Sequence, residues 1–169
     1  MRTPALIGIV LVATIAVGGC ADKSAGSSAR PDSTSAKAAE STPAVGAKID
    51  LGGQTTTYHG TADVTGTGKV TIQMQNRYFS PTVIHGKPGQ KLVLDLVNQS
   101  PDAHTFTTAD GLADIAVQPR AVAEGKITLP QSGNLLFFSR IDKAQGMVGT
   151  FNVSGPLNSP VPTASPQVT

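Results

Sequence analysis

Residues 133–153 read GNLLFFSRIDKAQGMVGTFNV, and this stretch decides the fold. Two short apolar segments, 135–138 and 148–153, flank the polar segment 139–147, which ends in Gly146 and Met147. Apolar segments of this length, bounded by glycine and polar residues, are typical of buried strands and are too short for core helices. The stretch therefore predicts two strands joined by a loop.

Further strands are predicted on the N-terminal side of this stretch. Apolar and polar residues alternate strictly at 70–75 and 92–97, as in half-buried strands. Shorter runs predict the remaining strands at 82–85, 104–107, 114–117 and 127–129. Turn residues separate the runs at 66–68, 87–89, 98–102, 119, 130–134 and 143–146. Because none of these segments has a helical apolar period, we expect an all-β, antiparallel sandwich of seven or eight strands. Residues 51–67 are expected to add an edge strand or a hairpin.

The N-terminus is typical of an export signal. Met1 and Arg2 precede an apolar run over 5–17, which is too short to span a bilayer comfortably. The following Val17-Gly18-Gly19-Cys20 resembles a bacterial lipobox, which implies cleavage before Cys20 and lipidation of that cysteine. The alternative is an ordinary secreted protein that is cleaved nearby and keeps a free cysteine. We expect an exported, extracytoplasmic protein that is lipid-anchored at the cell membrane or in the cell envelope.

Composition divides the chain into four parts. A signal peptide is predicted at 1–19, and residues 20–47 are rich in Ala, Ser, Lys, Thr and Gly, which predicts a flexible, lipid-anchored linker. Residues 48–154 form the predicted β-domain. Proline-rich, polar residues 155–169 predict a disordered tail.

Charge and cysteine content exclude several functions. The 13 Lys and Arg residues and 11 Asp and Glu residues are scattered along the chain, so no basic footprint for nucleic acid is present. Cys20 is the only cysteine, so the chain has no internal disulfide.

Two segments resemble the cupredoxin superfamily, which includes plastocyanin and azurin. The first runs from 79–90 through the strand at 92–97 and the loop 98–103 to His104-Thr105-Phe106, and the second is 133–153. The resemblance covers 70–153 and implies a Greek-key β-sandwich with a type 1 copper site.

The resemblance also assigns the copper-ligand positions. The family's loop runs Cys, two residues, His, four residues, Met, and the spacing here is the same. His104 corresponds to the first histidine ligand and Met147 to the methionine, but Ser139 replaces the cysteine and Asp142 the second histidine. Type 1 copper requires a cysteine thiolate, so these degenerate positions argue against such a centre. The alternative is a copper-binding or electron-transfer protein, in which His104, Asp142 and Met147 hold copper in an atypical site.

Without metal, we expect the side chains of His104, Ser139 and Asp142 to hydrogen-bond to one another and Met147 to fill apolar space beneath the loop. His59 and His85 are expected at the surface, because neither has ligand spacing to another His, Cys or Met.

No enzymatic activity is expected, because the chain contains neither a Gly-x-Ser-x-Gly nucleophile elbow nor an evident oxyanion donor. These observations favour a cell-envelope lipoprotein without cofactor, whose domain binds an unknown envelope protein or small ligand, and not nucleic acid. The loop 139–147 is where we expect a partner to bind, because binding residues concentrate on loops held by a rigid scaffold.

Overall fold

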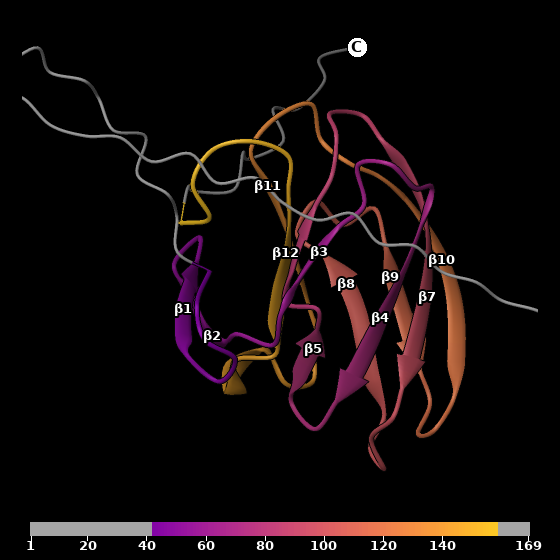
Figure 1. Ribbon diagram of the computed structural model, residues 1–169. Helices are drawn as coiled ribbons and strands as arrows, with labels where there is room; N and C mark the ends of the chain where they lie inside the picture. Colours follow the sequence, from indigo (N-terminus) through magenta and orange to yellow (C-terminus); the bar gives the residue numbers. More distant parts are fainter. Residues whose placement is uncertain (1–41, 159–169) are drawn as a thin grey trace, which may run out of the picture. The chain divides into compact units, whose positions relative to one another are not determined.

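The alternating strands fold into two facing β-sheets with a separate β-hairpin (Figure 1). The computed structural model describes residues 42–158. The predicted signal peptide 1–19, Cys20 and residues 159–169 lie outside the described residues, as does most of the predicted linker.

The smaller sheet has the strand order β10-β7-β4-β5, and the larger has the order β3-β6-β12-β11-β8-β9. The smaller sheet consists of β4 (Lys69–Gln75), β5 (Tyr78–Ser80), β7 (Lys91–Asn98) and β10 (Val122–Thr128). The larger sheet consists of β3 (Thr61–Asp63), β6 (Val83–His85), β8 (His104–Thr108), β9 (Asp114–Val117), β11 (Asn134–Phe138) and β12 (Val148–Asn152). The hairpin pairs β1 (Lys48–Leu51) with β2 (Gln54–Thr57), and a 3-10 turn, η1 (Lys143–Gln145), lies in the β11–β12 loop.

The all-β sandwich predicted from the sequence is confirmed, but its strand pairing is mixed. β4 pairs with β7 in parallel, and β6 pairs in parallel with both β3 and β12. These pairs form because the chain crosses between the two sheets before it returns, so strands that are not consecutive become neighbours. The segment 51–67, expected to add an edge strand or a hairpin, contains β2 and the edge strand β3, and β2 forms a hairpin with β1, which begins earlier, at Lys48. Hydrogen bonds also continue past residue 154, since Asn134 Nδ2 donates to the carbonyls of Pro156 and Leu157.

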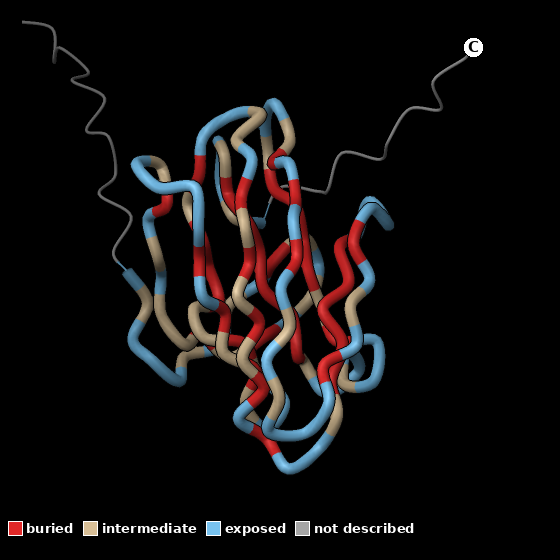
Figure 2. Tube along the Cα trace, turned by 90° about the vertical axis from the view of Figure 1, so that its right-hand side faces the viewer, coloured by how far each residue is buried: buried red, intermediate tan, exposed pale blue. Residues whose placement is uncertain are grey.

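Four phenylalanine rings occupy the centre of the core between the sheets. Phe79, Phe106, Phe137 and Phe151 are fully buried, and neighbouring ring centroids lie 5.0–6.5 Å apart. Buried residues run along the inner faces of the strands, and exposed residues gather in the connecting loops (Figure 2). Burial of apolar and aromatic surface is the main stabilising term for such a sandwich.

The loops gather at two ends of the sandwich. His104 begins β8 and pairs with Val117 at the end of β9, while Asn98 at the end of β7 pairs with Met74 of β4. Loops 76–77, 99–103, 118–121 and 139–147 therefore lie at one end, which we call the His104 end. It is the lower end in Figure 1, where the arrowheads of β4 and β7 and the turn η1 lie. Loops 86–90, 109–113 and 129–133 lie at the opposite end.

Gly149 permits close packing of β12 against β11. A Cβ atom at this position would lie 2.4 Å from Cζ of Phe137 and 2.9 Å from the carbonyl oxygen of Thr82. Gly149→Ala is therefore expected to lower the free energy of unfolding by about 1–3 kcal/mol, the usual cost of overpacking a core. Chemical denaturation measures this change. Gly66→Ala is the matched control, because no atom lies within 4 Å of its Cβ position. Equal stability of the two variants would contradict the packing argument.

Candidate functional site

Two loops bring together the four positions predicted from the sequence. His104 is the first residue of β8, Ser139 follows β11, and Met147 directly precedes β12. Asp142 lies in the site loop, residues 139–147, immediately before η1. His104, Ser139 and Met147 are 0–1 % exposed, and the side chain of Asp142 is 13 % exposed. The site is thus a closed interior cluster.

The predicted hydrogen bonds among His104, Asp142 and Ser139 are present. His104 Nδ1 lies 2.9 Å from Asp142 Oδ2, and the Ser139 hydroxyl donates to the same carboxylate oxygen at 3.4 Å. The backbone N–H of Thr105 donates to Ser139 Oγ at 3.3 Å. Since Asp142 Oδ2 only accepts when it is ionised, the imidazole Nδ1 must carry the proton that it donates. One carboxylate oxygen thus links β8 to the site loop.

The other ring nitrogen of His104 has no such partner. Nε2 is buried and forms no hydrogen bond with any residue of the 42–158 region. A buried polar atom without a partner carries a desolvation cost of about 1–3 kcal/mol. The cluster therefore satisfies only one side of the imidazole.

A second set of contacts fixes the start of the site loop. The backbone N–H of Arg140 donates to Thr105 Oγ1 at 2.8 Å, and its guanidinium group contacts the Asp114 carboxylate through Nε and Nη2, each at 3.0 Å. Thr107 Oγ1 donates to Asp114 Oδ1 at 2.8 Å. The hydrogen bond from Thr107, followed by the contact with Arg140, holds the pKa of Asp114 below its usual value. No sequence pattern indicates this clamp, because Arg140 and Asp114 are 26 residues apart and form no motif.

The hairpin strand β2 supports the far end of the site loop. Thr56 Oγ1 lies 2.7 Å from the carbonyl oxygen of Gly146 and 3.0 Å from that of Val148. Gly146 has φ of 90°, and a Cβ atom there would lie 3.1 Å from the Thr55 carbonyl oxygen. Left-handed backbone and close approach together explain why glycine precedes Met147.

The remaining histidines lie apart from the cluster. His59 stacks on Tyr78 with ring centroids 3.6 Å apart, and burial, then the nearby charge of Lys48, lowers its pKa. His85 Nδ1 lies 3.1 Å from Asn152 Oδ1. Within the described part of the chain, no group of three or more His, Cys, Asp and Glu side chains is placed to hold a metal ion.

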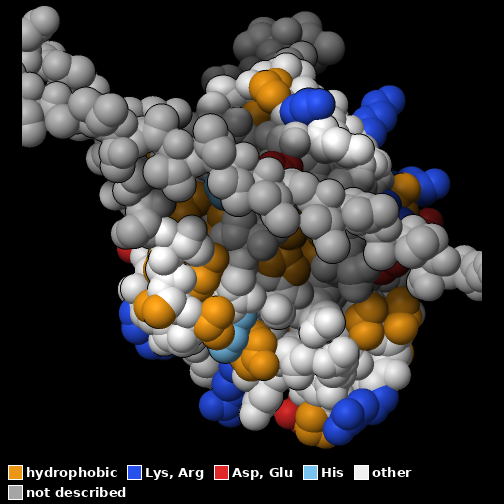
Figure 3. Space-filling view, viewed as in Figure 1, with side chains coloured by type: hydrophobic (Ala, Val, Ile, Leu, Met, Phe, Trp, Pro, Cys, Tyr) orange, Lys and Arg blue, Asp and Glu red, His pale blue; other side chains and the backbone are white. Residues whose placement is uncertain are grey.

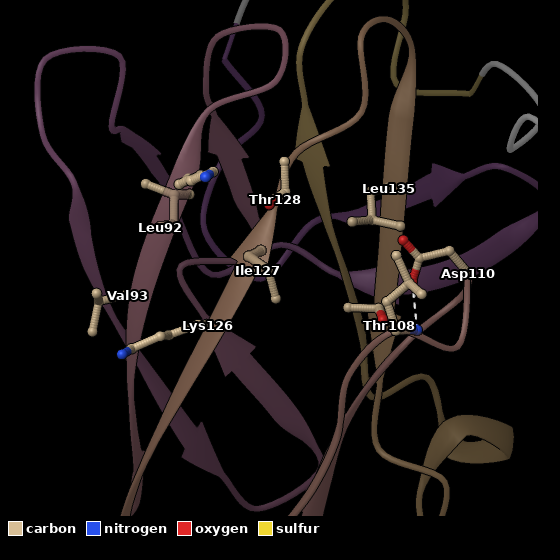
Figure 4. Close-up of a pocket in the computed structure, with 10 residues that line it drawn as sticks. Leu92, Val93, Thr108, Asp110, Lys126, Ile127, Thr128 and Leu135 are labelled. Atoms are coloured by element: carbon tan, nitrogen blue, oxygen red, sulfur yellow. Dashed lines mark hydrogen bonds between the residues drawn. The ribbon is translucent and has the colours of Figure 1, made fainter.

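A cavity of about 460 Å³ lies at the opposite end of the sandwich (Figure 4). Ile127 of β10 and Leu135 of β11 lie on either side of it, and Asp110 and Leu112 of the β8–β9 loop complete its wall. None of the positions predicted from the sequence lines this cavity.

The donor set of the cluster does not fit type 1 copper. It offers one imidazole, one carboxylate, one hydroxyl and one thioether, and a thiolate is missing from residues 42–158. The imidazole Nδ1 and the carboxylate, its best donors, are bonded to each other. The fold and the site together define a β-sandwich of the cupredoxin class with a buried His–Asp–Ser cluster at the positions that the resemblance assigns to metal ligands.

Comparison with known proteins establishes the family. The model of the cupredoxin-like domain family matches residues 51–151, more than half of the chain, so the chain belongs to this family. A search of curated proteins found no match.

The solved structures that are similar to this chain include two whose titles refer to copper. Auracyanin of Roseiflexus castenholzii is 15% identical, with 53% of this chain and 98% of that chain covered and a TM-score of 0.48. Auracyanin A of Chloroflexus aurantiacus, described as a "blue" copper protein, is 18% identical, with 52% and 100% covered and a TM-score of 0.43. The metal-binding domain of the Cu(I)-exporting P-type ATPase CopA of Streptococcus pneumoniae is 13% identical, with 57% and 98% covered and a TM-score of 0.46.

The His104–Asp142 contact can be tested by removing its carboxylate. Asp142→Ala leaves Nδ1 of a buried imidazole unpaired, so the free energy of unfolding is expected to fall by about 1–3 kcal/mol. In a His104→Leu background the same substitution is expected to cost less, because no imidazole is left unpaired. Chemical denaturation of the four proteins measures the coupling. Asp102→Ala is the control, since Asp102 is exposed and should change stability by no more than about 0.5 kcal/mol. Additive effects of the two cluster substitutions would contradict the assigned contact.

Proposed function

We propose that the protein is a cell-envelope lipoprotein whose cupredoxin-like domain binds a partner without a type 1 copper centre. The observation that carries this proposal is the 2.9 Å contact between His104 Nδ1 and Asp142 Oδ2. His104 Nδ1 and the Asp142 carboxylate, two of the candidate metal donors of the site, are hydrogen-bonded to each other in a largely buried cluster.

The chemistry of the cluster supports a function without electron transfer. A serine hydroxyl does not ionise near neutral pH and is a poor ligand for a soft metal, and a carboxylate is a hard donor. A copper ion held by such a set would lack the thiolate bond that characterises blue-copper electron-transfer sites.

The same cluster is not built for nucleophilic catalysis. In a serine hydrolase the histidine lies between serine and aspartate and accepts the serine proton. Here the Ser139 hydroxyl donates to Asp142 Oδ2, and so the aspartate lies between the other two residues. This order supports a non-enzymatic function, because His104 is hydrogen-bonded to Asp142 and not to the Ser139 hydroxyl, whose proton it would have to accept.

Export and anchoring are proposed from the N-terminal sequence. The apolar run 5–17, followed by Val17-Gly18-Gly19-Cys20, has the arrangement of a lipoprotein signal. Among residues 42–158, no helix combines the length and apolarity needed to cross a bilayer. A lipid on Cys20, followed by a linker over 20–47, would hold the β-domain at an extracytoplasmic membrane surface.

One observation favours the alternative function, in which the protein binds copper at an atypical site. His104 Nε2 is buried without a hydrogen-bond partner in the described region, and Met147 is buried at the end of the same loop. Imidazole nitrogens are common copper ligands, so the second candidate keeps His104, Asp142 and Met147 as its ligands.

Copper titration distinguishes the two functions. Native protein purified without added metal is expected to contain no stoichiometric copper and to develop no intense blue absorption when Cu(II) is added. The double variant Ser139→Cys/Asp142→His restores the thiolate and the second imidazole, so added Cu(II) is expected to produce that absorption band. Tight, stoichiometric Cu(II) binding by the native protein that disappears in His104→Ala would reject the proposed function in favour of the alternative.

Cell fractionation tests the anchor. Cys20→Ser removes the lipid attachment site, so the protein is expected to move from the membrane fraction to the soluble extracytoplasmic fraction. Mass spectrometry of the native protein should show acyl chains on Cys20. Ser24→Ala, in the same segment, is the matched control and should remain in the membrane fraction. Release of the native protein in soluble form with a free Cys20 thiol would contradict lipid anchoring.

A further inference from the structure

Two arginines occupy backbone conformations that normally require glycine. Among residues 42–158 the non-glycine residues with positive φ are Arg77 at 67° and Arg120 at 58°. The left-handed conformation costs about 1–2 kcal/mol for a residue with a Cβ atom. At the opposite end of the sandwich, Gly89, Gly111 and Gly133 hold the positive-φ positions.

Each arginine lies at a turn position for which glycine is the usual choice. Arg77 follows Asn76 in the two-residue connection between β4 and β5, where a positive φ at the third turn position alone favours glycine. Arg120 follows Pro119 in a turn closed by the hydrogen bond from the Ala121 N–H to the Gln118 carbonyl oxygen, at 3.2 Å. With proline second and a positive φ third, this turn is of type II, which favours glycine third. Backbone energy would favour glycine at both positions, so it does not explain why arginine is present at either one.

Both turns are attached to the loop that leads to His104. The Arg120 N–H donates to the carbonyl oxygen of Ser100 at 3.3 Å, and the Gln99 N–H donates to that of Met74 at 2.9 Å. The side chains of Gln75 and Gln99 also hydrogen-bond to each other. The two arginines thus flank loop 99–103 at the His104 end.

The charges of these arginines are not neutralised within the described part of the chain. Arg77 and Arg120 are exposed, and neither forms a salt bridge with residues 42–158. Of the acids at this end, Asp142 is bound to His104 and Asp114 to Arg140, while Glu124, two residues after Val122 on β10, is exposed and forms no salt bridge with residues 42–158. The flanking loop 99–103 contributes one carboxylate, that of Asp102.

Exposed apolar side chains lie at the same end. Ile141 in the site loop is 57% exposed, and Val122, two residues after Arg120, is 66% exposed. Along the lower edge of Figure 3, which is the His104 end, Lys and Arg side chains and hydrophobic side chains are exposed, and an acidic side chain lies among them. Arginine beside exposed apolar groups is typical of protein–protein interfaces.

We propose that the His104 end, which carries Arg77, Arg120, Val122 and Ile141, binds an acidic patch on a partner protein. This inference rests on the proposed function and names the partner's chemistry. Guanidinium groups pair with carboxylates in a bidentate manner, and fixed turns reduce the entropy lost when they do so. An anionic membrane would be attracted equally by lysines and gives no reason for arginine at strained positions.

A binding assay with an acidic peptide tests the proposal. The probe is a fluorescein-labelled peptide of ten glutamates, titrated with the full-length protein at low salt and followed by fluorescence anisotropy. Arg77→Gly/Arg120→Gly removes both guanidinium groups and relieves both strained turns. Its affinity for the peptide is expected to fall by about tenfold, the scale of two exposed ion pairs, while its melting temperature stays the same or rises. Lys91→Gln/Lys126→Gln removes the same charge at the opposite end and is expected to change the affinity by less than about twofold.

The other outcomes would overturn the proposal. Equal losses in the two double variants would indicate non-specific attraction to net charge. A lower melting temperature of the glycine variant would show that the arginines contribute to folding. Arginine-dependent binding to phosphatidylglycerol vesicles, with no peptide binding, would identify a membrane as the partner. Copper binding by the native protein would reject the proposed function, but it would not change the affinities of the native protein and the arginine variant for the peptide. Failure of the proposed function can therefore be told apart from failure of this inference.

Discussion

Packing of four phenylalanine rings between the sheets is the interaction on which the rest of the structure depends. Phe106 lies two residues after His104, and Phe137 lies two residues before Ser139. Because side chains alternate along a strand, each polar residue points to the same side of its sheet as the neighbouring ring. The ring centroids of Phe106 and Phe137 are 5.1 Å apart, so the contact that fixes the core also aims both site residues into the interior.

The sequence predicted those parts of the fold in which local patterns and burial agree. Alternation identified β4 and β7, and turn residues separated most strands correctly. β5 was missed because Tyr78–Ser80 is three residues long and follows a turn with arginine in place of the usual glycine. The parallel pairs could not be predicted by periodicity, since alternation within one strand says nothing about the direction of its neighbour.

The site was predictable for a different reason. The spacing of the residues in its loop matches that of the cupredoxin ligand loop, although two of the residue types differ. The spacing brought Ser139, Asp142 and Met147 into one loop, and hydrogen-bonding capacity predicted their contacts with His104. The unpaired Nε2 atom was not predictable, because it depends on the side-chain packing around a ring that is 1% exposed. The Arg140–Asp114 clamp depends in the same way on the register of β8 with β9.

A buried cluster without a thiolate or a metal ion must still satisfy its polar groups. Asp142 supplies an acceptor for His104, and Ser139 binds the same oxygen while it accepts the N–H of Thr105. Charge-assisted hydrogen bonds of this kind contribute roughly 1.5–3 kcal/mol, so the site loop retains an attachment to β8 without a metal ion. Because the interior cluster and the phenylalanine core hold the loops, the strained arginine turns can persist at the same end of the sandwich. Strain of this kind persists where the surrounding structure over-determines the backbone.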